Sequence, residues 1–474
     1  METTLLSSIV IVIGLLSSHV SADWEEYAEE IRRLSENNTS AQSALRANFL
    51  RSSKAVGMKN FPCSVSVSSG RIPTSVHELR PSDIKVIGAL GDSLTAGNGI
   101  DASYIWQVLK QYRGLSWSIG GDKHLEEVTT LPNMLKKYNP NLAGYSIGTG
   151  SVKKTEISRL NVAVPGSEAI NMVTQARMMI DRMKADKKVD FNNDWKMVTL
   201  FVGSNDLCDW VKHQDKFKPE NYIANIKSAL DLLQKEMPRT FVNLMQIADV
   251  LELAENQRIS CKVLRLYLCP SAIFSKKALV PVMAKYRQLL RELVASGVYD
   301  VKDDFTVVLQ PMYEETKIPK KKNSDENDRS YFAPDCFHFS GKGHAAAAKA
   351  LWNNLFEPVG KKTNSFDPSK DIVLECPSGE NPYFYTAKNS QPKQLKSAAA
   401  AAPAPSDEND GSRHPVEDTK SKETAPSALP VAFAVVGGVL IVLCIVAAVV
   451  MVMRRRRTPE SEQTWLFSTS TAQA

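Results

Sequence analysis

Apolar, strand-like runs alternate with segments of helical periodicity between residues 84 and 355, and this pattern constrains the fold more than any other feature. Strands are expected at 84–90, 160–164, 197–203, 241–247 and 305–310. Helices are expected at 168–187, 219–236, 275–296 and 341–355. Such alternation is typical of a parallel sheet that is covered by helices on both faces. We therefore predict an α/β fold whose reactive groups gather at the carboxyl edge of the sheet.

The charge of the chain is nearly balanced outside one cluster. The 474 residues include 58 basic and 52 acidic side chains, a net charge of +6, and four of the positive charges are Arg454–Arg457. No basic stripe with interleaved aromatic residues occurs, so nucleic acid is not expected as the main partner. The content of 43% hydrophobic and 23% charged residues is that of an ordinary globular protein.

The N-terminus has the pattern of a secretory signal. Residues 1–22 combine a short apolar core with small residues up to Ala22, which predicts a signal peptide that is cleaved before Asp23. The first residues contain Glu2 and no Lys or Arg, which is unusual for a signal peptide. An uncleaved anchor is therefore the alternative interpretation.

A second apolar segment lies near the other end of the chain. Residues 429–453 are 25 residues without a charge, enough to cross a hydrocarbon core of about 30 Å as a helix. Arg454–Arg457 follow directly and mark the cytoplasmic side. We expect a single-pass type I membrane protein with residues 454–474 as a cytoplasmic tail. A GPI signal is disfavoured by the four Arg and the polar tail, and a buried globular helix by the uniform apolarity.

The segments between the two membrane signals differ in composition. Residues 23–80 are expected to form an N-terminal helical extension, and residues 81–388 a single globular domain. Residues 389–428 are rich in Ala, Pro, Ser and charge, cannot bury a core, and are expected to form a flexible stalk. Adjacent sequons at Asn37 and Asn38 fit a glycosylated ectodomain.

An extracellular location is an oxidising compartment, which makes disulfides possible. Six cysteines lie outside the apolar segment: Cys63, Cys208, Cys261, Cys269, Cys336 and Cys376. Six cysteines allow fifteen connectivities, and the sequence alone does not choose among them. The pairs Cys261/Cys269 and Cys336/Cys376 are plausible local closures.

The strand expected at 84–90 ends abruptly in Gly91-Asp92-Ser93. A serine at the carboxyl end of a strand is placed where α/β enzymes present a nucleophile, and Gly91 permits a sharp turn of the backbone. The pattern is not the G-x-S-x-G elbow of α/β-hydrolases, because Thr95 stands two residues after the serine. An isolated Gly-Asp-Ser is more often a helix cap, so a second signal is needed.

The second signal is a pairing of Asp335 with His338, three residues apart in a Pro-led segment before the helix expected at 341–355. A tight turn at this spacing can place a carboxylate beside Nδ1–H of the imidazole and leave Nε2 free for Ser93. His344 is the competing histidine, but it is expected on the following helix, facing away. Three further histidines have no suitably placed acidic partner: His77, His124 and His213.

Ester hydrolysis also needs donors for an oxyanion. Gly166 and Asn205 follow two further expected strands and could supply a backbone and a side-chain amide. Either residue alone is a weak signal, because Gly and Asn are normal turn residues. Together with Ser93 and the Asp335/His338 pair, they place candidate groups at four strand ends of one sheet.

These residues resemble the four blocks of the GDSL (SGNH) hydrolases, in order: Gly91-Asp92-Ser93-Leu94, Gly166, Asn205, and Asp335 with His338. The segments "GDSLTAGNG", "NVAVPG", "GSNDLC", "APDCFHFSGKGH" and "ALWNNLFEPVG" are most similar to the animal membrane-associated phospholipase B group. The resemblance covers roughly residues 40–388, and the signal peptide and C-terminal anchor fit the group as well. Some relatives carry several such domains in tandem, whereas this chain carries one.

The resemblance implies a three-layer α/β/α SGNH-hydrolase-like fold and a serine esterase that acts on acyl esters of phospholipids and lysophospholipids. It assigns Ser93 as nucleophile, His338 as base and Asp335 as the residue that orients the base. The oxyanion donors would be Gly166, Asn205 and the Ser93 amide, and no metal or organic cofactor is needed. An esterase of acetylated carbohydrates and a non-catalytic receptor or adhesion ectodomain are the alternatives.

Two departures from the group's pattern concern cysteines. The group often has a second cysteine three residues after Cys208, where this chain has Val211, and a C-P-C pattern reads Cys269-Pro270-Ser271 here. The two losses could be the halves of one missing disulfide. If each left a partner behind, Cys208 or Cys269 would carry a free thiol.

Overall fold

The structure, a computed structural model, describes residues 54–65, 72–254, 261, 264–265, 268–324 and 326–391, all within one compact unit. The segments predicted as signal peptide, transmembrane span and tail, most of the stalk, and the sequons at Asn37 and Asn38 lie outside these ranges. None of the helices in the described ranges combines the length and apolarity needed to cross a membrane.

The centre of the described region is a parallel sheet. Its strands are β1 (Ile84–Gly91), β2 (Trp195–Phe201), β3 (Thr240–Met245) and β4 (Phe305–Gln310). They lie side by side in the order β1-β2-β3-β4, and every neighbouring pair is parallel. The register aligns Leu90 with Leu200, Leu200 with Leu244, and Leu244 with Leu309, so all four strands end at the same edge.

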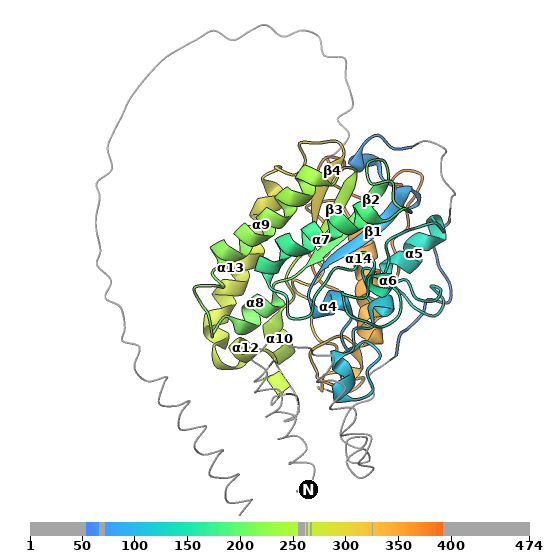
Figure 1. The fold of residues 1–474 in the computed structure, drawn as a ribbon. Helices are drawn as coiled ribbons and strands as arrows, with labels where there is room; N and C mark the ends of the chain where they lie inside the picture. The colour runs from blue at the N-terminus through green and yellow to red at the C-terminus, as the bar shows by residue number, and fades with distance from the viewer. Residues whose placement is uncertain are drawn as a thin grey trace, which may run out of the picture. The chain divides into compact units, whose positions relative to one another are not determined.

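Helices cover both faces of the sheet (Figure 1). One layer contains α7 (Met172–Ala185), α9 (Pro219–Glu236) and α13 (Lys276–Ala295), and the other contains α5 (Leu131–Tyr138) and α14 (Gly341–Leu355). Side chains of a strand alternate between its two faces. In β1, Val86 and Leu90 join the core under the first layer, whereas Ile87 and Ala89 join the core under the second. The expected α/β/α architecture and its four long helices are thereby confirmed.

Short helices line the sheet edges and the connections. The α-helical ones are α4 (Ser93–Ala96), α6 (Thr155–Ser158), α8 (Ser204–Asp209), α10 (Val250–Ala254) and α12 (Pro270–Phe274). The 3₁₀ helices are η1 (Val76–Glu78), η2 (Pro81–Asp83), η3 (Ile105–Leu109), η4 (Arg113–Leu115), η5 (Ala169–Asn171) and η6 (Arg329–Tyr331). Two of them, α4 and α8, begin directly beyond β1 and β2 and so lie at the carboxyl edge.

The strand predicted at 160–164 is the one element of the sheet that differs. It forms three backbone hydrogen bonds with β1 but is paired with it as an isolated parallel bridge, between Asn161 and Ala89, and not as a strand. Its outward carbonyls are occupied by Arg113, whose guanidinium donates to the oxygens of Asn161 and Ala163 at 2.9 and 2.8 Å. A side chain, and not a further strand, thus satisfies the outward carbonyls of this segment.

The disulfides join different partners from the local closures considered above. The structure pairs Cys63 with Cys376, Cys208 with Cys269, and Cys261 with Cys336. The pairings Cys261/Cys269 and Cys336/Cys376 were therefore wrong, because tertiary packing brings together cysteines 313, 61 and 75 residues apart. Neither Cys208 nor Cys269 carries a free thiol.

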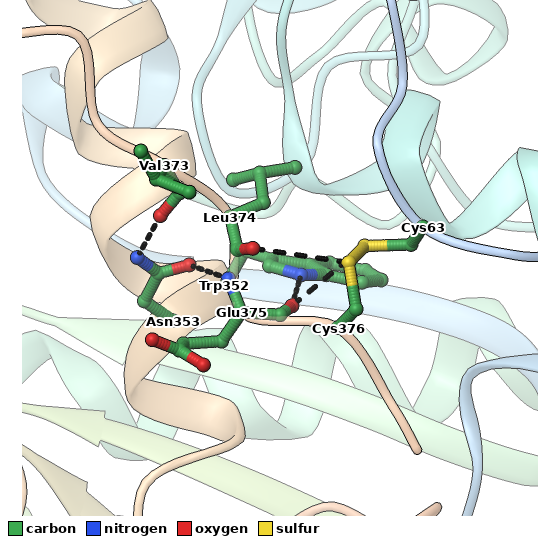
Figure 2. Close-up of a disulfide and its surroundings, with 7 residues drawn as sticks. All are labelled: Cys63, Trp352, Asn353, Val373, Leu374, Glu375 and Cys376. Carbon is green, nitrogen blue, oxygen red and sulfur yellow. Dashed lines mark hydrogen bonds between the residues drawn. A yellow bond between two sulfur atoms is a disulfide. The ribbon is translucent and has the colours of Figure 1, made fainter.

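The Cys63–Cys376 disulfide joins two segments, one near each end of the domain, and lies beside α14 (Figure 2). The indole Nε1 of Trp352 donates to the carbonyl of Glu375 at 2.7 Å, directly beside the disulfide. Asn353 donates to the carbonyl of Val373 and accepts from the amide of Glu375, at 2.7 and 2.9 Å. This segment is thus held by hydrogen bonds as well as by the covalent link.

The two cysteine departures, Val211 and Ser271, meet in space. The amide of Val211 donates to the hydroxyl of Ser271 at 2.8 Å. The neighbouring Cys208–Cys269 disulfide crosses between the same segments. The positions therefore fit the two halves of one missing disulfide, replaced here by a hydrogen bond.

Replacing both residues, Val211→Cys with Ser271→Cys, should restore a fourth disulfide. The gain in stability should be small, because Cys208–Cys269 already closes nearly the same loop. Mass spectrometry of non-reduced peptides checks the link, with Ser271→Cys alone as the control that must show a free thiol. Two unpaired thiols in the double variant would contradict the placement.

Candidate active site

Ser93 stands where β1 ends. Gly91 has φ +154°, and a Cβ there would meet the Phe201 carbonyl oxygen at 2.4 Å, so only glycine lets β1 turn here. Asp92 then caps α4 by accepting from the Leu94 amide at 2.9 Å. The helix-capping role considered for Ser93 belongs to Asp92, and Ser93 is left as the first residue of α4, with 5% of its surface exposed.

Three side chains form a continuous chain of hydrogen bonds. The Ser93 hydroxyl lies 2.8 Å from Nε2 of His338, although the two residues are 245 apart in sequence. Nδ1 of the same ring lies 2.5 Å from Oδ2 of Asp335. The other carboxylate oxygen, Oδ1, accepts from the amides of Phe337 and His338, both at 3.0 Å. The structure thus brings together the serine, histidine and aspartate that the sequence singled out.

Burial and pairing set the charges of this trio. Burial alone would raise the pKa of Asp335, but His338 and two backbone amides hold it below its usual value. Burial alone would lower the pKa of His338, but the carboxylate of Asp335 raises it above 6.5. With its Nδ1 proton donated to Asp335, the neutral imidazole offers Nε2 as an acceptor for the hydroxyl of Ser93.

The turn that contains Gly166 lies against the end of β1. The Val164 amide donates to the Gly91 carbonyl at 3.2 Å, and the Asn205 side chain donates to the Ser167 carbonyl at 2.8 Å. Gly166 has φ +76°, and a Cβ there would meet no atom within 4 Å, so the space in front of this residue is open. Among the described residues its amide has no hydrogen-bond acceptor. The turn with Gly166 thus lies against the end of β1, and Asn205 contacts this turn from beyond the end of β2.

The family assignment follows from a comparison with known protein families. Residues 87–351 match the GDSL-like lipase/acylhydrolase family, which covers more than half of the chain. This chain belongs to that family. The matched range begins in β1 and ends in α14. It includes the five predicted site residues: Ser93, Gly166, Asn205, Asp335 and His338.

The curated relatives are much longer than the segment that aligns with them. Mouse membrane-associated phospholipase B1 is 47% identical over 70% of this chain and 23% of its own length. The human protein of the same name is 45% identical over 69% of this chain and 23% of its length. The chain therefore spans less than a quarter of these relatives. Among solved structures, phospholipase A1 from Streptomyces albidoflavus aligns with a TM-score of 0.23 and 11% identity, covering 55% of this chain and 95% of that one.

Two buried polar residues that support the site were not found from the sequence. The Gln175 side chain accepts from the Gly91 amide at 2.8 Å and donates to the Gly91 carbonyl and the Ser167 hydroxyl at 2.9 and 3.0 Å. Asp206 accepts from the Ala169 amide with both oxygens, at 3.1 Å. Gln175 lies in a helix without any motif, so no signal could have found it. Asp206 follows Asn205 directly, and that adjacency was the available signal.

Two further features lie near the trio, the side chain of His344 and an apolar pocket. His344 lies on α14 as expected, and its Nδ1 accepts from the Trp117 amide at 3.2 Å. A largely apolar pocket lies beside the trio, and its lining includes Leu94, Phe337 and Phe339, the chain neighbours of Ser93 and His338. Ser93 and His338 themselves do not line it. No cluster of three or more metal-ligating side chains occurs in the described part of the chain.

Asp206 should make stability depend on pH. Burial, with the nearby Glu168 and Asp92 charges, raises its pKa from 3.8 to about 7, so the folded protein keeps a proton that the unfolded chain loses. The free energy of unfolding should therefore fall as pH rises between about 4 and about 7, by at most about 1.4 kcal/mol per pH unit from this group. Asp206→Asn, which keeps an oxygen for the Ala169 amide, should flatten that decline.

Urea unfolding at about pH 5 and about pH 8 measures this effect. Asp92, whose pKa burial raises to about 6, contributes in the same direction, so a residual decline is expected in the variant. Asp209→Asn on the same helix is the matched control and should retain the wild-type decline, since it removes only a surface ion pair with Lys212. An equal decline in wild type and Asp206→Asn would contradict the assignment.

Proposed function

We propose that this chain is a phospholipase B and lysophospholipase that hydrolyses acyl esters as a serine esterase. The observation that supports it is the hydrogen-bonded chain from Ser93 through His338 to Asp335, set in a domain of the GDSL-like lipase/acylhydrolase family. Ser93 is the nucleophile, His338 the general base and acid, and Asp335 the residue that orients the imidazole. The names of the relatives, membrane-associated phospholipase B1, suggest the substrate class.

The first half of the reaction acylates the enzyme. Nε2 of His338 takes the hydroxyl proton as Oγ of Ser93 bonds to the ester carbonyl carbon, which becomes tetrahedral. The carbonyl oxygen then carries the negative charge. When the bond to the glycerol oxygen breaks, His338 gives its proton to that oxygen, and the acyl group remains on Ser93. In the second half, water takes the place of the serine hydroxyl: it gives a proton to His338, attacks the acyl carbonyl carbon and releases the fatty acid from Ser93.

The oxyanion is stabilised by donors that need not reorganise. We assign the amides of Ser93 and Gly166 and the side-chain amide of Asn205 to this role. The support is the open space at Gly166 and the contact of Asn205 with the Ser167 carbonyl, which fixes the side chain at the strand end. One N–H of Asn205 makes that contact, and the other is available for the substrate.

Two observations favour a lipid substrate over the two alternatives. The relatives' name, phospholipase B1, favours the acyl ester of a phospholipid over an acetylated sugar. The intact trio with its pKa-shifted histidine argues against a receptor without catalysis. We further propose that residues 429–453 anchor the chain in the plasma membrane with the catalytic domain outside, as a single-pass type I protein.

Ser93→Ala should abolish hydrolysis of lysophosphatidylcholine while the domain remains folded, because the change removes the nucleophilic hydroxyl and its one hydrogen bond to His338 and leaves the apolar core intact. Release of fatty acid from phosphatidylcholine and lysophosphatidylcholine micelles measures the activity, and an acetylated sugar serves as the comparison substrate. Wild type that hydrolyses only the acetylated sugar would favour the carbohydrate esterase. Wild type and Ser93→Ala that are equally inactive, yet bind cells equally, would favour the receptor.

Asn205→Asp should reduce kcat by about 100-fold to 1,000-fold, because it replaces the oxyanion donor with an acceptor of the same shape. KM should change much less, since the contact strengthens only in the transition state. Steady-state kinetics with lysophosphatidylcholine measure both constants. Asn221→Asp, at an exposed helix position, is the matched control. Unchanged kcat in Asn205→Asp would remove Asn205 from the oxyanion hole.

A further inference from the structure

The turn between Asp335 and His338 has an unusual residue at its centre. Cys336 has φ +61°, a left-handed backbone conformation that residues with a side chain adopt rarely. Its amide donates to the Ala333 carbonyl at 2.9 Å, and the Ala333 amide donates to the His338 carbonyl at 2.7 Å. The position of the imidazole therefore depends on a turn whose central residue must be held in this conformation.

Two contacts, from Cys261 and from Arg265, hold Cys336. Its sulfur is bonded to Cys261, and its carbonyl oxygen accepts from Nη2 of Arg265 at 2.7 Å. Cys261 and Arg265 are four residues apart in the sequence, and each has only 1% of its surface exposed. Cys336 is thus held at its side chain by a disulfide and at its backbone by a hydrogen bond.

Arg265 is costly to keep in this place. Only 1% of its surface is exposed, and burial lowers its pKa to about 10, so at neutral pH it remains a cation inside the protein. Among the described residues, the Cys336 carbonyl is its one hydrogen-bond acceptor. A buried guanidinium aimed at a single carbonyl of the Asp335–His338 turn indicates a role in placing that turn.

We propose that Cys261 and Arg265 are positioning residues that clamp Cys336 and thereby keep His338 in hydrogen-bond contact with Ser93. The inference rests on the proposed esterase function. The distance from Nε2 to the hydroxyl is 2.8 Å, and catalysis is sensitive to displacement, since about 1 Å of misplacement can cost about 100-fold in rate. Releasing the clamp should lower the rate of the chemical step and leave the affinity for the substrate nearly unchanged.

The test compares two disulfides in the full-length chain in detergent micelles. Cys261→Ser with Cys336→Ser removes the clamp disulfide, and Cys63→Ser with Cys376→Ser is the matched control. The control disulfide closes a separation of 313 residues against 75, so its loss should destabilise the domain at least as much. With a short-chain p-nitrophenyl ester, the clamp variant should lose at least about 10-fold in kcat with KM within about twofold, and the control should keep kcat.

A second variant removes the hydrogen bond alone. Arg265→Met keeps the disulfide and much of the buried volume, and it should lower kcat by a smaller factor with KM unchanged. Combined with Cys261→Ser and Cys336→Ser, it should add less than its separate effect, because both contacts act on one turn. Labelling of Ser93 by a fluorophosphonate should slow in the same order.

The outcomes separate the inference from the proposed function. A wild-type chain without activity on any ester would overturn the function itself. With active wild type, a clamp variant that keeps kcat, or loses no more than the control, overturns the clamp. Should the clamp variant fail to fold, Arg265→Met decides alone, and an unchanged kcat in that variant overturns the proposal.

Discussion

The contact between Ser93 and His338 is the interaction on which the site depends, and it joins residues 245 positions apart. It exists because parallel strands end at one edge of the sheet. Ser93 follows β1 directly, whereas His338 follows β4 after a loop and precedes α14. A shift of β1 by one residue would turn its side chains to the opposite face and move Ser93 away from the imidazole. The buried register of the sheet, with the two cores on its faces, therefore determines the geometry of the trio.

The edge of the sheet is stabilised by polar groups that are expensive to bury. Gln175 satisfies the Gly91 amide, which would cost about 1–3 kcal/mol if left without a partner, and shares the Gly91 carbonyl with the Val164 amide. Asp92 and Asp206 are buried carboxyl groups with raised pKa values of about 6 and about 7. Such groups reduce stability when they ionise, which is consistent with a site that gives up stability to hold backbone amides in position.

The three disulfides stabilise different parts of the domain, and two of them join segments near the site. Cys63–Cys376 lies beside Trp352 and secures segments near both ends of the domain, whereas Cys261–Cys336 reaches into the turn that carries His338. Cys208–Cys269 joins α8, which begins with Ser204 and Asn205, to the start of α12. Two of the three links thus end on segments that carry site residues.

Local patterns in the sequence were sufficient for the elements and for the serine, histidine and aspartate that the structure brings together. Periodicity predicted α9 and α14 to the residue and the four strands nearly so, since burial on both faces leaves continuous apolar runs. The Gly-Asp-Ser and Asp-x-x-His patterns identified Ser93, Asp335 and His338, because their chemistry restricts both residue type and spacing. The edge segment at 160–164 was overpredicted as a strand, since it forms only an isolated bridge. No neighbouring residue indicates that Arg113 will occupy its outward carbonyls. The disulfide partners, the support from Gln175 and the grip of Arg265 on Cys336 were decided only by the tertiary structure. Each of these joins residues far apart in the chain, and their pairing depends on where packed layers place them rather than on any neighbouring residue.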